Sequence, residues 1–287
     1  MAALMFFVIT NFILAVPTAA ANALVIVAIL TTSSLRTPSY LLLTNLAFND
    51  LGVGIFCQPG FAVLVIMRLF GDFEPYLLIS VNFVSIVLMY VSVLTATAIS
   101  VDRYMAIRLK MRYRSVVTLR RVRLFCVFSW IAPFVVLVSG ILRMHSLFVI
   151  GLVGLTVCLV VITVSYTMSF RALKIHCAQI QPQGNQQPNS TTQSNAIDVL
   201  KYRKLLKTML LIVMFNVVCY MSLLGILATM LHPEHVGGLI MSGLTTIAGA
   251  NSTLNPVIYL TRMKDIRKAC VQILRKLFRC KERQNEN

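Results

Sequence analysis

Long apolar runs separated by short polar stretches dominate the chain. A hydrocarbon core about 30 Å thick needs about 20 apolar residues in one helical span. Seven stretches meet this requirement, at residues 5 to 31, 39 to 66, 76 to 101, 122 to 142, 147 to 170, 208 to 231 and 236 to 260. The pattern therefore predicts an all-α membrane protein, with a bundle of seven transmembrane helices in one domain over residues 1–260. Because the first stretch begins near Met1 with no basic segment before it, we expect a retained helix rather than a removed signal peptide.

Two polar segments lie outside these spans. Residues 178 to 196 are rich in Gln, Asn, Ser and Pro, and this composition predicts a disordered loop between the fifth and sixth spans. Residues 262 to 280 alternate basic and apolar positions with a helical period. One predicted face holds Ile266, Cys270, Ile273, Leu274, Leu277 and Phe278. Residues 261–287 are therefore predicted to form an amphipathic interfacial helix and a short cytoplasmic tail.

Composition and charge support a membrane protein and fix a predicted orientation. Hydrophobic residues make up 58% of the chain and charged residues only 12%, which argues against a soluble domain. The net charge of +17 could indicate a nucleic-acid partner. However, 24 of the 26 Lys and Arg residues lie on one side of the membrane if the N-terminus is outside, and only Arg68 and Arg143 lie on the other. The positive-inside rule thus predicts a multi-pass plasma-membrane protein with an extracellular N-terminus, a cytoplasmic C-terminus, contacts to membrane lipids and no nucleic acid.

Seven cysteines are scattered along the chain without the paired spacing of a metal site. Most lie in apolar helices and are expected to be small core residues. Cys270 and Cys280, on the interfacial helix, are candidates for palmitoylation.

Two polar motifs close apolar spans. Asp102-Arg103-Tyr104 ends the third span, and Asn255-Pro256-Val257-Ile258-Tyr259 ends the seventh. Charges and helix-breaking residues are costly in a membrane, so they tend to be kept where they have a function. Other marked positions, in chain order, are Asn22, Leu46-Ala47-Phe48-Asn49-Asp50, Ser92, Trp130, Tyr166, Phe215, Cys219, Asn251 and Ser252.

This order of motifs resembles the rhodopsin-like (class A) G-protein-coupled receptors over essentially the whole chain. The stretch from Arg103 to Arg123 and the short loop near His145 are most similar to the adenosine and melanocortin receptor group. The resemblance implies a receptor for an extracellular or membrane-borne small-molecule, lipid or peptide ligand. It also implies a heterotrimeric G protein and an arrestin as partners, and no enzymatic activity. Consistent with this, the sequence shows no nucleophile triad, paired carboxylates or metal cluster.

Asp50 lies in the middle of the second span, where a charge costs about 2.5 to 3.5 kcal/mol. A polar partner is therefore expected. Ser92, Asn251, Ser252 and Asn255 offer hydroxyl and amide oxygens, which are hard ligands that suit a small cation. By resemblance this set is an allosteric Na⁺ site. The alternative is a hydrogen-bonded polar core with a protonated Asp50.

The resemblance assigns Arg103 as the residue that contacts the G protein, with Asp102 restraining it. The family's acidic partner in the sixth span is replaced by Tyr202, so we expect raised ligand-independent signalling. Pro256 bends the seventh span so that Tyr259 can approach Tyr166. The remaining assigned switch positions are Tyr104, Phe215 and Met111. The alternatives are that Arg103 only anchors the helix and that Met111 faces lipid.

The outer half of the predicted bundle departs from the family in ways that bear on the ligand. Tyr220 and Ser222 replace the usual tryptophan and proline of the sixth span. Ser85 stands where amine receptors carry an aspartate. The candidate pocket lining is mildly polar and comprises Gln58, Asn82, Ser85, Met89, Tyr220 and Thr245. Such a lining suits a small neutral or lipid-like ligand, although ordinary helix packing would supply similar residues.

Two other functions remain open from the sequence alone. Asp50, Asn22 and Asn255 could line the ion path of a transporter or channel, but internal repeats and paired broken helices are not evident. A receptor-like partner that does not activate G proteins is compatible with Tyr220 and Ser222, whereas the intact Arg103 argues against it.

Overall fold

The computed structural model describes residues 2–72, 74–142, 145–180, 217 and 238–285. The regular structure in this part of the chain consists of helices alone. The long helices are α1 (Ala2–Thr31), α2 (Pro38–Gly52), α3 (Gln58–Phe70), α4 (Pro75–Leu109), α6 (Leu119–Ile141), α7 (His145–Ile180), α9 (Gly238–Arg262) and α10 (Lys264–Asn285). Short helices connect them, namely η1 (Ser33–Leu35), η2 (Val53–Cys57), η3 (Lys110–Arg112) and α5 (Tyr113–Val116).

The predicted spans correspond closely to these helices. The first five match α1, the continuous α2–η2–α3 stretch, α4, α6 and α7, while the seventh matches α9. The sixth, at residues 208 to 231, lies outside the described residues except for Val217, which packs against the cluster of Ala96, Ile162 and Tyr166. By length and composition, five helical stretches within the described chain are apolar enough to cross a membrane. They comprise Ala2–Thr31, Pro38–Phe70, Pro75–Val116, Leu119–Val138 and Val153–Ala172.

Two helices are longer than the sequence predicted. α4 continues past residue 101 to Leu109, because the residues that follow the Asp102-Arg103-Tyr104 motif are good helix formers without glycine or proline. The helix ends at Lys110, whose backbone has a φ of 45°. α7 continues to Ile180, so residues 178–180 of the predicted loop are helical. The rest of that loop lies outside the described residues.

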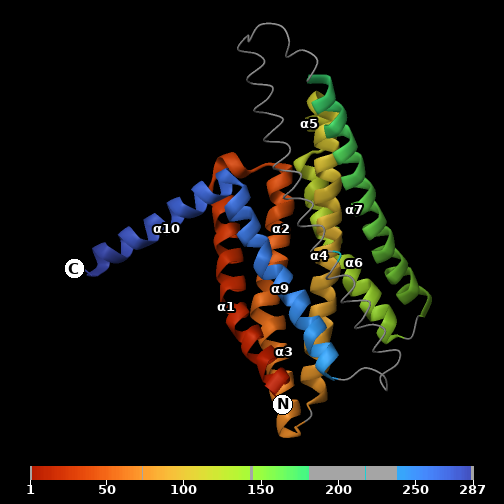
Figure 1. Ribbon diagram of the computed structural model, residues 1–287, viewed down its shortest axis with the longest axis vertical. Helices are drawn as coiled ribbons and strands as arrows, with labels where there is room; N and C mark the ends of the chain where they lie inside the picture. The colour runs from red at the N-terminus through yellow and green to blue at the C-terminus, as the bar shows by residue number, and fades with distance from the viewer. Residues whose placement is uncertain (1, 73, 143–144, 181–216, 218–237, 286–287) are drawn as a thin grey trace.

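α4 occupies the middle of the bundle (Figure 1), between α2 on one side and the pair α6 and α7 on the other. α1 packs against α2, α3 and α9. We call the end at which α1 begins the outer end, and the opposite end, from which α10 departs, the inner end. Figure 1 shows α10 leaving the inner end and running away from the bundle axis.

A cluster of buried apolar side chains closes the inner end. It joins α1, α2, α4, α6, α9 and α10 through residues that include Val25, Leu46, Ile99, Val122 and Tyr259. From α10 the cluster takes Ile266, Ala269 and Cys270, whereas Leu274 is 38% exposed. The amphipathic face predicted for this helix therefore has two parts. Its first turns cover the bundle, and Leu274 further along remains free to meet a membrane surface.

The second span contains a five-residue π-helix, η2, immediately before Gln58 and Pro59. A π-helical turn of this kind accommodates a proline that cannot donate its backbone hydrogen bond. Here it also brings the span close to α1. A Cβ atom added to Gly54 would lie 2.8 Å from the backbone nitrogen of Ala19 and 3.1 Å from Thr18. Only a residue without a side chain fits this contact without a shift.

Polar side chains connect α1 to α9 along the length of both helices, and we call this contact the α1–α9 seam. Amide and hydroxyl bonds of this kind stabilise helix pairs in lipid by about 0.6 to 2 kcal/mol each. From the outer end inward, Asn11 Nδ2 donates to Thr246 Oγ1 at 2.8 Å, Thr18 Oγ1 and Thr253 Oγ1 share a bond, and Asn22 Nδ2 donates to the carbonyl of Ser252 at 3.2 Å.

Candidate functional site

The polar core of the bundle surrounds Asp50, which is completely buried. Its Oδ2 accepts a hydrogen bond from Asn255 Nδ2 at 2.8 Å, and Ser252 and Asn49 are its other polar neighbours. Its Oδ1 has no hydrogen-bond partner. The sequence therefore correctly predicts an intramembrane carboxylate that faces the bundle interior and is bonded to Asn255.

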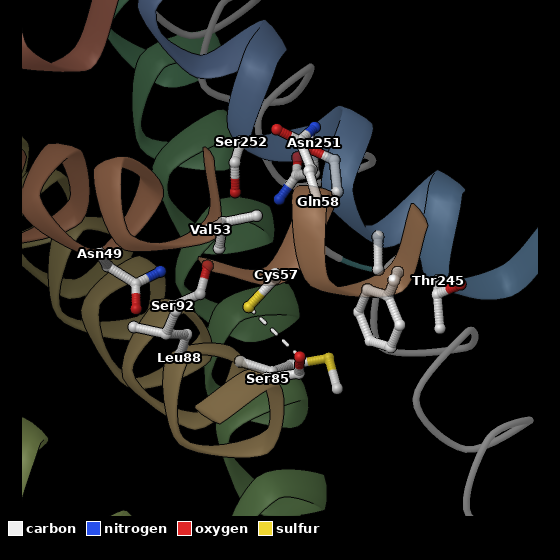
Figure 2. A pocket seen from close by; sticks show the side chains of 14 residues that line it. Asn49, Val53, Cys57, Gln58, Ser85, Leu88, Ser92, Thr245, Asn251 and Ser252 are labelled. Atoms are coloured by element: carbon white, nitrogen blue, oxygen red, sulfur yellow. Dashed lines mark hydrogen bonds between the residues drawn. The ribbon is translucent and has the colours of Figure 1, made fainter. Parts of the chain in front are cut away.

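Several other buried oxygens nearby also have no hydrogen-bond partner, namely Oδ1 of Asn251 and Asn255, and Oε1 of Gln58. Of these residues, Asn251 and Gln58 line a cavity of about 70 Å³, which we call the inner cavity. Figure 2 shows Asn49, Ser92, Asn251 and Ser252 around it. One water needs about 10 to 15 Å³ of such space, so the cavity can hold a small ion together with one or more waters.

The oxygens at this place fit a monovalent cation. One carboxylate with neutral amide and hydroxyl oxygens is a hard donor set of low charge. Within the described residues, no group of three or more His, Cys, Asp or Glu side chains is placed to hold a metal. Asp50, Ser92, Asn251, Ser252 and Asn255 are the residues predicted for Na⁺. Of these, Ser92, Asn251 and Ser252 line the inner cavity directly.

At the inner end of α4, three groups hold the carboxylate of Asp102. Arg103 Nη2 lies 2.9 Å from Asp102 Oδ2, and Ser39 Oγ donates to the same oxygen at 2.8 Å. Tyr113 Oη donates to Asp102 Oδ1. Asp102 is only 4% exposed. The predicted restraint of Arg103 by Asp102 is thus present in the geometry, and it is reinforced by two hydroxyl groups that sequence reasoning missed.

The Arg103 side chain is bonded to Asp102 through Nη2 and is partly exposed. It is 21% exposed, and its Nε has no hydrogen-bond partner. The Tyr104 hydroxyl accepts a hydrogen bond from Arg108 Nη1 at 2.8 Å. Met111, in η3 at the same end, is 94% exposed. An arginine and an apolar side chain are therefore both presented at the inner end.

The two tyrosines predicted to approach each other lie in separate clusters in this conformation. Tyr259 is 1% exposed, packs in the inner-end cluster, and its hydroxyl has no hydrogen-bond partner. Tyr166 packs with Ala96 and Ile162 between α4 and α7. Pro256 is buried within a continuous α9. Phe215, the remaining switch position, lies outside the described residues.

The residues predicted for a ligand pocket divide between two cavities. Gln58, Ser85, Met89 and Thr245 line the inner cavity. Asn82, together with Thr245, lines a larger cavity of about 390 Å³ near the outer end, which we call the outer cavity. Tyr220 lies outside the described residues. The sequence thus identified residues that line cavities, but it did not show that these residues are divided between two cavities of different size, with Thr245 in both.

Asn45 is a buried hydrogen-bonding hub that sequence reasoning also missed. Its Oδ1 accepts from Trp130 Nε1 at 3.0 Å, and its Nδ2 donates to Thr95 at 2.8 Å and Ser129 at 3.3 Å. Trp130 was a marked position, and this network gives it a structural role between α2, α4 and α6.

The structure separates the two cysteines predicted for palmitoylation. Cys270 is 2% exposed, and burial raises the pKa of its thiol. A buried, protonated thiol is a poor nucleophile and has no room for an acyl chain. The geometry therefore argues against Cys270. The side chain of Cys280 lies outside the described part.

Comparison with known proteins agrees with this arrangement of spans and motifs. The family model of the seven-transmembrane receptors of the rhodopsin family matches residues 21–146 and 139–259. The adenosine receptor A2b of Rattus norvegicus is 26% identical over 311 aligned positions, which cover 96% of this chain and 91% of the rat receptor. The human receptor A2b is 25% identical with the same coverage, and the adenosine receptor A3 of Ovis aries is 22% identical over 90% of this chain and 86% of its own length.

The chain therefore belongs to the rhodopsin family of seven-transmembrane receptors. It is a multi-pass membrane protein and a G-protein-coupled receptor related to adenosine receptors, and not an enzyme. The transporter and the non-signalling partner are not favoured by these matches.

Proposed function

We propose that the receptor binds its ligand at the outer end, facing the extracellular side of the plasma membrane, and activates a G protein through Arg103 at the inner end. The observation that carries this proposal is the set of interactions at the Asp102 carboxylate, which accepts hydrogen bonds from Ser39 and Tyr113 and forms an ion pair with Arg103. Three partners on one buried carboxylate fix the arginine at the end of α4 where a cytosolic protein can reach it. Arrestin is a second expected partner of the same surface.

We also propose that this receptor signals above background without ligand. Within the described residues, Arg103 has one ion pair, and that pair is with its own neighbour on α4. The sequence has Tyr202 where the family places an acid in the sixth span. A guanidinium restrained from one helix alone is released more easily than one tied across two helices.

Guanine-nucleotide exchange on a panel of G proteins, in membranes that contain the ligand-free receptor, tests both statements. We expect the exchange rate to exceed that of untransfected membranes. Arg103→Ala should reduce this excess at least about tenfold, because a hydrogen bond to a charged group contributes about 1.5 to 3 kcal/mol. The exposed Arg120→Ala, at matched surface expression, is the control that should retain the activity. Exchange equal to background in the wild-type receptor would contradict the proposal of basal signalling.

A third proposal is that Na⁺ binds at Asp50 and favours the inactive conformation. Support comes from the partnerless oxygens of Asp50, Asn251 and Asn255. A bound ion would neutralise the carboxylate, and the chain's own amide and hydroxyl groups would complete its coordination. Thermal unfolding should occur at higher temperature in NaCl than in KCl for the wild-type protein, because an ion that binds only the folded state stabilises it. Asp50→Asn should remove this difference, and a persistent difference in that variant would exclude Asp50 as the ligand.

A further inference from the structure

The outer cavity lies between α1, α3, α4 and α9, and helix α1 forms a wall that the sequence did not predict. Leu4, Phe7 and Asn11 of α1 line it opposite Asn82 of α4. Its volume of about 390 Å³ is within the range of about 300 to 1,000 Å³ that ligand pockets occupy. The inner cavity, at about 70 Å³, is several times smaller, so of these two cavities the outer one has room for an organic molecule.

Asn11 supplies a buried acceptor on the wall of this cavity. The residue is 3% exposed, and its Nδ2 donates to the carbonyl of Phe7 at 2.9 Å and to Thr246 Oγ1 at 2.8 Å. Because both donor bonds fix the amide, its Oδ1 is the group left over, and it has no hydrogen-bond partner. A buried acceptor without a partner costs about 1 to 3 kcal/mol, which a ligand hydroxyl or N–H could recover.

Two carboxylates from the short turn between α3 and α4 also line the cavity. Asp72 and Glu74 line it and are exposed, and Arg68 is the basic group beside them. Within the described residues, the single ion pair is that of Arg103 and Asp102, so Arg68 does not neutralise either acid by direct contact. Among the described residues that line the cavity, two acids and one base give a net negative charge, in a protein whose net charge is +17.

We propose that the outer cavity binds an amphiphilic cation, with an ammonium near Asp72 and Glu74, an apolar body, and a hydroxyl or N–H donor that reaches Asn11. This inference rests on the proposed function, since it names the ligand class of that receptor. It differs from the neutral ligand expected from the sequence, because the acids of the turn and the acceptor on α1 are outside the residues considered there.

The same contacts connect the outer cavity to the centre of the bundle. Phe61 and Thr245 line both cavities. Asn11 bonds to Thr246, and the α1–α9 seam continues from there to Ser252 beside the Asp50 site. A ligand that bonds to Asn11 therefore acts on the helix pair that also forms one side of the polar core.

Thiol labelling of the full-length receptor in nanodiscs tests the cavity without any G protein. Asn82→Cys places a thiol on the cavity wall, and Ile79→Cys places one on the exposed face of the same helix as a matched control. The probes are a cationic reagent, 2-aminoethyl methanethiosulfonate, and its anionic sulfonatoethyl analogue. The wild-type chain gives the background of its native cysteines, and thermal unfolding confirms that each variant is folded.

We expect the cationic reagent to label Asn82→Cys at least about tenfold faster than the anionic one, relative to their rates with a free thiol, because local fields of this kind change encounter rates by about 10 to 10³. Adding Asp72→Asn and Glu74→Gln should remove most of this preference. Ile79→Cys should show none. Equal rates of the two reagents at Asn82→Cys would overturn the assignment of a cationic ligand.

Protection by small amphiphiles then tests the two ends of the ligand separately. 8-Amino-1-octanol should slow labelling more than octylamine, which lacks the hydroxyl, and more than 1-octanol, which lacks the ammonium. Asn11→Leu should make the amino alcohol no better than octylamine. Protection that is equal for all three molecules, or that Asn11→Leu leaves unchanged, would overturn the proposal. Because labelling does not require nucleotide exchange, a silent receptor with protected thiols would count against the proposed function alone.

Discussion

At Gly54 the second span approaches the backbone of α1 closely. Alanine at this position would place its Cβ 2.8 Å from Ala19 N, and this atom belongs to the backbone of α1 rather than to the end of a flexible side chain. Overpacking of this kind costs about 1 to 3 kcal/mol. We expect Gly54→Ala to lower the thermal unfolding temperature of the purified receptor clearly.

The matched control for this substitution is Gly154→Ala in α7. A Cβ there meets no atom within 4 Å, and alanine is favoured over glycine in a helix by about 1 kcal/mol. The stability of Gly154→Ala should therefore be equal to that of the wild type or higher. If both variants unfolded at the same temperature as the wild type, the close approach at Gly54 would not be a real constraint.

Individual site residues were predictable from the sequence where a charge or a motif marked them. Asp50 and Arg103 could be identified because a charged group in or next to an apolar span is energetically costly and therefore rare. Ser39, Asn45 and Asn11 could not be identified in this way, since one hydroxyl or amide in a helix is common and its partner is far away in the sequence. Asn11 and Thr246, for example, are 235 residues apart. Periodicity describes one helix at a time and contains no information on such pairs.

At the scale of elements, α10 is the helix whose role the structure changed most. The sequence predicted an interfacial helix, and the exposed side of Leu274 agrees with that prediction. The buried positions Ile266, Ala269 and Cys270 instead attach its first turns to the bundle, and Tyr40 Oη adds a bond to Asp265 Oδ2 at 3.3 Å. Hydrophobic periodicity gave the correct apolar face but could not distinguish a protein neighbour from lipid.

Removal of the Ile266 side chain should detach α10. Ile→Ala at a fully buried site costs about 2 to 5 kcal/mol, so we expect faster amide hydrogen exchange along α10 in Ile266→Ala. Leu274→Ala, on the exposed part of the same helix, is the comparison and should exchange like the wild type. Unchanged exchange in Ile266→Ala would mean that α10 is held by other contacts.

At the scale of the whole molecule, the distribution of charge predicts how the bundle crosses the membrane. The sequence predicts that the two sides differ strongly in basic residues, with 24 of 26 on the inner side. We therefore expect an N-terminal epitope tag to be stained on intact cells and a C-terminal tag only after permeabilisation. Staining of the C-terminal tag on intact cells would reverse the assigned orientation, and with it the proposed sides of ligand and G protein.

The α1–α9 seam has a consequence for the motions open to the bundle. The three hydrogen bonds of the seam involve Asn11, Thr18 and Asn22 of α1. A translation of either helix by one turn along its axis would therefore break all three at once. Rotation about the line of contact would leave them intact. The seam therefore acts as a fixed axis, about which α9 can turn its opposite face while its height in the membrane stays constant. A conformational change that passes through this pair of helices would then be a rotation of α9 relative to α1 and not a translation along the helix axis.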